Sequence, residues 1–203
     1  MGFLPEHPKI HSDCQRAAGP TYWKNIGCNS KILDVISEGY RIPFHSTPSK
    51  SFSPNNKSAL IHRTFVDEAL YELLRTSRVK IVKKRPHVIN PLSVAERHGK
   101  LRLILDLRKV NLHVFKDKVR FDDWKVMEDF VEKGDFGFKF DISQGYHHID
   151  IHEDFQTYLG FSWPLDGIPC YYIFSVLPFG LTSAPSIFTK TVRVLMKSGG
   201  PNQ

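Results

Sequence analysis

The chain has 203 residues, 41% of them hydrophobic, which is enough for one substantial core or two small ones. It contains neither the run of roughly 20 apolar residues that a membrane helix needs nor the basic-then-apolar start of a signal peptide, so we expect an intracellular protein of cytoplasm or nucleus without a membrane partner. Its net charge of +7 is concentrated between Glu72 and Arg120, where 14 Lys/Arg face four acidic residues; this block favours phosphate-bearing partners, although a solvated cationic surface has the same composition.

The first sixty residues are rich in residues that interrupt regular structure. Gly19-Pro20, Pro43, Pro48 and the stretch Ser53-Pro54-Asn55-Asn56 fall within them. This composition predicts a loosely ordered lead-in over residues 1–60, with a short helix near Ile32 to Ser37.

Regular periodicity begins near Thr64. A helix is predicted through Arg78 because apolar residues recur on one stripe, namely Phe65, Val66, Ala69, Leu70, Leu73 and Leu74. A basic, β-rich stretch follows, with strands predicted at Val79–Val82, at His87–Ile89 and, after the turn at His98-Gly99, at Leu101–Leu107.

The second half alternates helices and strands. A helix is predicted from Asp122-Asp123 to Gly134, a strand from Phe136 to Asp141, and a short helix within Ser143 to Ile151. Aromatic and β-branched residues predict a hairpin of Tyr158–Trp163 with Tyr171–Val176. A last helix follows Gly180, with Pro185 in its first turn, where a missing N–H does no harm. The pattern is α+β, with helices packed on one side of an antiparallel sheet.

Asp141 is the first candidate catalytic residue. It ends an apolar strand, and the main-chain carbonyl of Ile142 next to it is a second hard oxygen that suits Mg²⁺. An aspartate at a strand end is also a common turn or helix cap. The adjacent His147 and His148 point apart on a helix and are interpreted as structural.

Two segments together indicate a family. Phe140-Asp141-Ile142, followed by Gly145-Tyr146-His147, resembles the first catalytic motif of reverse transcriptases from long-terminal-repeat and tyrosine-recombinase retrotransposons. Leu177-Pro178-Phe179-Gly180, running on to Pro185, resembles the second motif of the same enzymes. Gly99 to Asn111 is similar to their fingers segment, with Arg102 at a matching position.

The resemblance implies a role for each of these residues. Asp141 and Ile142 would hold Mg²⁺ (or Mn²⁺), and Tyr146 would exclude a ribose 2′-hydroxyl, although a packed aromatic is the alternative. Phe179 and Gly180 would contact the incoming nucleotide. Arg102, and Arg97 as the nearest match to a second cation, would bind the triphosphate, although both also suit solvent-facing strand positions. Asp106 is interpreted as the partner of a nearby cation.

The implied fold is the fingers and partial palm of a right-hand polymerase over residues 61–203. Such an enzyme copies an RNA or DNA template-primer with deoxynucleoside triphosphates by two-metal nucleotidyl transfer. The aromatic-x-Asp-Asp motif that supplies its other carboxylates does not occur up to Gln203. We therefore expect the 203 residues alone to be inactive, and a non-catalytic nucleic-acid-binding remnant is the alternative function.

Overall fold

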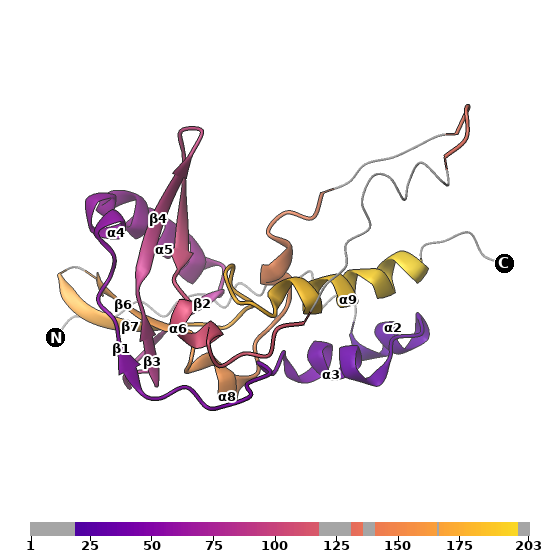
Figure 1. The fold of residues 1–203 in the computed structure, drawn as a ribbon, viewed down its shortest axis with the longest axis horizontal. Coiled ribbons are helices and arrows are strands. Elements are labelled where there is room, and N and C mark those ends of the chain that lie inside the picture. The colour runs from indigo at the N-terminus through magenta and orange to yellow at the C-terminus, as the bar shows by residue number, and fades with distance from the viewer. Residues whose placement is uncertain (1–18, 118–130, 136–140, 166, 199–203) are drawn as a thin grey trace.

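A computed structural model describes residues 19–117, 131–135, 141–165 and 167–198 (Figure 1). Its helices are α2 (Pro20–Asn25), α3 (Ser30–Glu38), α4 (Lys57–Ile61), α5 (Arg63–Arg75), α6 (Arg108–Asn111), the 3-10 helix η1 (Gly145–His148), α8 (Glu153–Gln156) and α9 (Ala184–Ser198). Its strands are β1 (Ser51–Phe52), β2 (Val79–Val82), β3 (Val88–Asn90), β4 (Leu92–Arg97), β5 (Lys100–Leu105), β6 (Gly160–Leu165) and β7 (Ile168–Phe174). The predicted strand at 136–140 and most of the predicted helix at 122–134 lie outside the described residues.

The main sheet has the strand order β1-β3-β6-β7-β2. The predicted hairpin is confirmed, because β6 and β7 pair antiparallel from Gly160↔Ile173 to Leu165↔Ile168. The sheet as a whole is mixed: β2 joins β7 antiparallel, whereas β3 pairs in parallel with both β1 and β6. The α+β class is confirmed.

Helix α5 forms where the apolar stripe predicted it and buries Val66 and Leu70. It ends at Arg75, before the predicted Arg78, because Ser77 adopts a left-handed conformation (φ 55°). The Ser77 N–H then donates to the Leu74 carbonyl and the Arg78 N–H to the Leu73 carbonyl, which is the Schellman pattern of a helix end. One face of the main sheet packs toward this helix, since Trp163 Nε1 donates to Asp67 Oδ1 at 2.6 Å.

Strands β4 and β5 form a separate antiparallel hairpin that projects from the main sheet (Figure 1). The predicted turn is confirmed, since His98 and Gly99 both have positive φ, at 51° and 70°, as a two-residue turn of type I′ requires. β4 was not predicted as a strand.

Residues 19–60 contribute helices α2 and α3 and the buried side chains of Trp23, Ile32 and Ile42. The predicted helix near Ile32 to Ser37 is confirmed within α3, whose first turn is capped by Asn29 Oδ1 accepting from the Ile32 N–H. A boundary at residue 60 stays a prediction.

Three distant segments meet beside α3. The Tyr40 N–H donates to the Asp150 carbonyl at 2.7 Å, and Asp150 forms a bridge with Val176. Gly39 is required at this crossing, because its φ is 87° and a Cβ there would lie 2.6 Å from the His152 nitrogen. Among the described residues, no helix is long and apolar enough to cross a membrane.

Candidate active site

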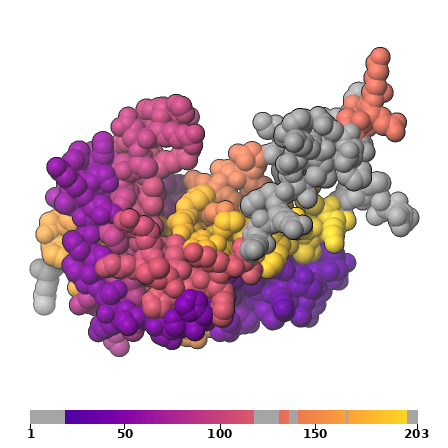
Figure 2. Space-filling model, in the orientation of Figure 1, coloured from indigo at the N-terminus to yellow at the C-terminus, as the bar shows by residue number. Residues whose placement is uncertain are grey.

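The surface is hollowed between the β4–β5 hairpin and the segment that carries η1 (Figure 2). The segments that carry the quoted motifs border this hollow. They come from three parts of the chain: the hairpin, the loop and 3-10 helix at 141–148, and the turn at 177–183 that leads into α9.

Asp141 lies exposed at the start of the loop that leads into η1. Gln144 closes this loop in a left-handed conformation (φ 51°), which is uncommon for a residue other than glycine. Its side-chain oxygen accepts from the Arg78 guanidinium and from His147 Nδ1, the latter at 3.2 Å. These bonds hold the turn that joins Asp141 to η1.

The imidazole of His147, which helps to hold this loop, is uncharged at neutral pH. Burial, together with the charges of Arg78 and His148, lowers the pKa of His147 to about 4. His148 Nε2 lies 3.2 Å from the Ser143 carbonyl, so the second histidine also supports the loop. Both contacts fit the structural interpretation of this pair.

Tyr146 and Phe179, from motifs more than thirty residues apart, are in direct contact. Their ring centroids are 4.9 Å apart, and Tyr146 also meets Phe188 of α9 edge-on at 5.1 Å. Partial burial raises the pKa of the Tyr146 hydroxyl. Phe179 stays half exposed, so the pair leaves part of an aromatic surface open to solvent.

Gly145 allows this cluster to close. A Cβ at Gly145 would lie 2.5 Å from Cζ of Phe188, well inside van der Waals contact. The glycine before Tyr146 therefore lets η1 pack directly on α9.

The turn at 177–183 is fixed by Asn111 at the end of α6. Asn111 Nδ2 donates to the Gly180 carbonyl at 2.8 Å, and its Oδ1 accepts from the Thr182 N–H at 2.9 Å. Gly180 has a φ of 96°, which glycine adopts without strain. Asn111 thus positions the turn that carries Phe179.

The hairpin presents cations on one face. Directly paired residues point to the same side, as do residues two apart, so the pairs Arg97↔Lys100 and Ala95↔Arg102 place Arg97, Lys100 and Arg102 together. All three are exposed. No described hydrogen bond or ion pair joins Arg97 or Arg102 to Asp141, so their roles remain predictions.

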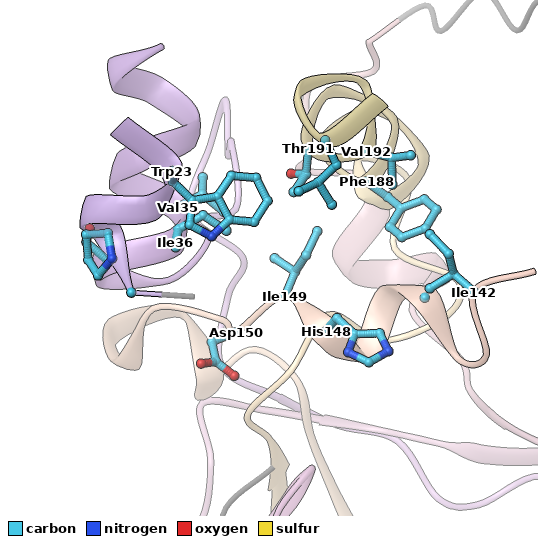
Figure 3. Close-up of a pocket in the computed structure, with 15 residues that line it drawn as sticks. Trp23, Val35, Ile36, Ile142, His148, Ile149, Asp150, Phe188, Thr191 and Val192 are labelled. Atoms are coloured by element: carbon cyan, nitrogen blue, oxygen red, sulfur yellow. The ribbon is translucent and has the colours of Figure 1, made fainter. Parts of the chain in front are cut away.

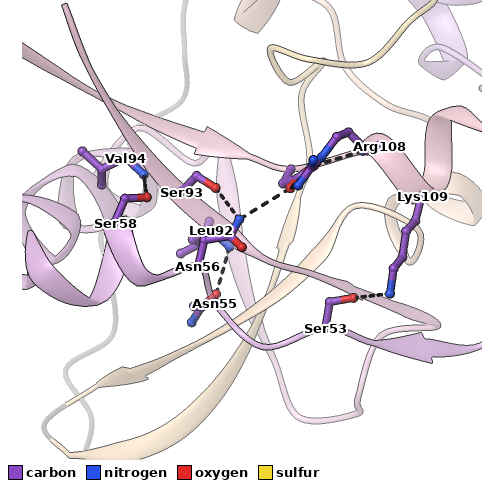
Figure 4. A network of polar contacts seen from close by, with 10 residues as sticks. Ser53, Asn55, Asn56, Ser58, Leu92, Ser93, Val94, Arg108 and Lys109 are labelled. Carbon is purple, nitrogen blue, oxygen red and sulfur yellow. Dashed lines mark hydrogen bonds and ion pairs between the residues drawn. The ribbon is translucent and has the colours of Figure 1, made fainter.

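Asp106 has the structural role that the sequence indicated. It pairs with Arg108 at 2.6 Å and accepts from Asn56, which also donates to Ser93 Oγ at 2.6 Å (Figure 4). The hydrogen bond from Arg108 holds the pKa of the Asp106 carboxyl below its usual range. This network ties β4 and α6 to the segment before α4.

A second hollow opens behind the site, between α2, α3 and α9, with a volume of about 500 Å³. Trp23 lies across it from Phe188 and Ile142, and Ile149 projects between them (Figure 3). Ile142 is part of the lining of this space and is 36% exposed.

Three residues of this site were missed from the sequence. Asn111 closed the quoted fingers segment but carried no assigned role. Arg78 and Gln144 are 66 residues apart and share no motif, so only the fold shows that they meet.

Comparison with known proteins supplies the family. The family model described as reverse transcriptase (RNA-dependent DNA polymerase) matches residues 82–199, more than half of the chain. The chain belongs to the reverse transcriptase family.

Viral polyproteins and one solved structure are similar to it. A polyprotein of Cassava vein mosaic virus is 32% identical over 95 residues, covering 46% of the chain and 14% of that protein. Polyprotein P3 of Commelina yellow mottle virus is 23% identical over 181 residues, covering 87% of this chain and 9% of that protein.

The crystal structure of the prototype foamy virus protease-reverse transcriptase shares the fold. The TM-score is 0.58 at 20% identity, over 80% of this chain and 20% of that one. The chain thus spans a fifth or less of each of these relatives, and it has the fold of fingers with part of a palm.

Proposed function

We propose that this chain forms the nucleotide-binding part of an RNA-directed DNA polymerase that copies a template-primer held in the hollow. The observation that carries the proposal is the contact of Tyr146 with Phe179. Two separate motifs converge there on a half-exposed aromatic surface, backed by α9 and held by Asn111.

Each group has a chemical role suited to its position. The cations of the β4–β5 hairpin, Arg97 and Arg102, would neutralise the triphosphate, for which a guanidinium offers several donors in one plane. The ring of Phe179 would lie against the nucleotide beside Gly180, whose missing side chain allows close approach. Tyr146 would occupy the space of a ribose 2′-hydroxyl and so favour deoxynucleotides.

Divalent metal use is general in the family, and Mg²⁺ or Mn²⁺ is our proposal for this chain. The exposed carboxylate of Asp141 and the carbonyl of Ile142 are hard oxygen donors that fit such an ion. When bound, the metal would neutralise phosphate charge and activate the primer hydroxyl. Within the described residues there is no group of three potential ligands, so Asp141 would contribute only part of the ligand set.

The sugar preference tests the proposal. The nucleotides dUTP and UTP differ only in the ribose 2′-hydroxyl, and we expect the chain to bind dUTP more tightly. Tyr146→Ala should reduce the ratio of the two dissociation constants at least about fivefold. Tyr71→Ala removes an exposed tyrosine on α5 and serves as the matched control. An unchanged ratio of dissociation constants in Tyr146→Ala would overturn the assigned role.

The chemistry is tested by primer extension on an RNA template, using a longer polypeptide that contains these residues. Asp141→Asn should abolish extension while leaving the thermal unfolding midpoint unchanged. Extension at the unmodified rate would remove Asp141 from the mechanism.

A further inference from the structure

A second candidate surface lies on the face of the main sheet opposite α5. Residues that are paired on neighbouring strands point to the same side of the sheet, so strand pairing places one row of side chains across this face. In register, the row runs Phe52, Ile89, Gly160, Ile173 and Lys80. The alternate residues of β6, Phe161 and Trp163, point to the α5 side.

The loop from β2 to β3 crosses this face. Pro86 lies directly over Gly160, since a Cβ there would be 2.4 Å from Cβ of Pro86. Arg85 precedes it, and its guanidinium stands over the Phe52 ring at 5.6 Å from the centroid. The loop therefore carries Lys83, Lys84 and Arg85 across the sheet toward Phe52.

The described residues form no ion pair with the cations of this face. These cations, Lys80, Lys83, Lys84 and Arg85, are all exposed. Phe52 is 52% exposed despite the cation above it. We call these five residues the outer basic surface. They belong to the edges and loop of the main sheet, whereas Arg97, Lys100 and Arg102 belong to the separate β4–β5 hairpin.

We propose that the outer basic surface binds a single strand of nucleic acid at a position separate from the polymerase site. A row of cations beside an exposed aromatic ring fits a chain of phosphates whose bases are free to stack. The four cations contact phosphates, and a base stacks at Phe52, where Arg85 already shows that a flat cationic group is accommodated. A duplex keeps its bases inside the helix and cannot use the ring.

The test uses the 203-residue chain, without nucleotide or metal, and 5′-labelled 20-mers of oligo(U) and oligo(dT) in fluorescence anisotropy. One variant carries Lys83→Glu, Lys84→Glu and Arg85→Glu. Its matched control carries Lys24→Glu, Lys31→Glu and Arg41→Glu, which makes the same change in net charge at exposed positions in and after α2 and α3. Circular dichroism confirms that both variants are folded.

We expect the loop variant to bind at least about tenfold more weakly and the slope of log affinity against log salt to fall by about 2, since three phosphate contacts are lost. The control variant should retain most of its single-strand binding. Equal losses in the two variants would reduce the effect to net charge and overturn the proposal. A loss for only one of the two oligomers would identify that strand, RNA or DNA, as the ligand.

The aromatic contribution is tested separately. Phe52→Ala should weaken single-strand binding at least about fivefold and leave duplex binding unchanged. Phe115→Ala, which removes a 58% exposed phenylalanine elsewhere, is the control. An equal loss of duplex affinity in Phe52→Ala would contradict stacking. These outcomes are independent of the dUTP preference, so either proposal can fail without the other.

Discussion

Asn111 holds the turn at 177–183 through both atoms of its amide, so its removal should loosen that turn selectively. Asn111→Ala deletes the 2.8 Å bond to the Gly180 carbonyl and the 2.9 Å bond from the Thr182 N–H. Water can replace Asn111 as the donor to the Gly180 carbonyl, because that carbonyl is exposed. Water replaces the acceptor of the partly buried Thr182 N–H less completely. We estimate a loss of about 1.5 kcal/mol in the free energy of unfolding. For a chain of this size that corresponds to a fall in Tm of about 3 to 6 °C.

The direct assay is hydrogen exchange of the Thr182 amide. Its protection should fall by about tenfold in Asn111→Ala, whereas amides of β6 and β7 should change only by the global loss of stability. Asn111→Asp keeps the acceptor for Thr182 and should preserve most of this protection. Asn25→Ala, at the exposed end of α2, controls for substitution of an asparagine. If Thr182 exchanged at its original rate in Asn111→Ala, the clamp would have no energetic role.

Three further predictions concern the backbone and the partly buried His147. Gly39→Ala should lower the free energy of unfolding, measured by urea denaturation, by about 2 to 4 kcal/mol, because the added Cβ collides with the His152 nitrogen and the positive φ is strained. Gly27→Ala is the control: its φ is 78° but the space around it is open, so it should cost only about 1 kcal/mol. Similar losses at both sites would exclude the collision. Ser77→Gly should stabilise the chain by about 0.5 to 1 kcal/mol because glycine adopts the left-handed helix end without strain, and a lower denaturation midpoint would contradict this. Because the pKa of His147 is depressed to about 4, the unfolded chain binds its proton first as pH falls from about 6.5 to 4, and the free energy of unfolding should decrease over that range by up to about 3 kcal/mol. His147→Phe should flatten this part of the pH profile, and an unaltered profile would assign the dependence to other groups.

Local patterns predicted most of the elements that periodicity governs. The stripe at Phe65 to Leu74 gave α5, and the aromatic, β-branched runs gave the β6–β7 hairpin, because burial of one face fixes those repeats. An antiparallel sheet was predicted, and the parallel pairing of β3 with β1 and β6 corrects that part, since the pairing with β6 depends on contacts between segments about 70 residues apart. No local pattern encodes such a pairing.

The same distinction between local patterns and long-range contacts applies to the residues of the candidate site. Tyr146, Phe179 and Gly180 were predicted because they belong to segments with a recognisable order of residues, and the structure brings the two rings together. Arg78, Gln144 and Asn111 act through hydrogen bonds to parts of the chain 66 or more residues away, so their sequence neighbours carry no signal. Asp141 is exposed at the start of the loop to η1, the strand predicted to end at it lies outside the described residues, and its metal-binding role stays a prediction.

The parallel pairing of β3 with β6 also has a consequence for synthesis on the ribosome. β3 is synthesised before β6, so the pairing of Ile89 with Gly160 at the centre of the main sheet can form only after residue 160 has been added. At about 5 to 20 residues per second, that interval is roughly 4 to 14 s. During this time β1 and β3 present open edges, and the apolar stripe of α5 has no sheet to cover. Translation speed between codons 90 and 174, and chaperone capture of the nascent chain, should therefore influence the yield of folded protein more than the order in which its helices form.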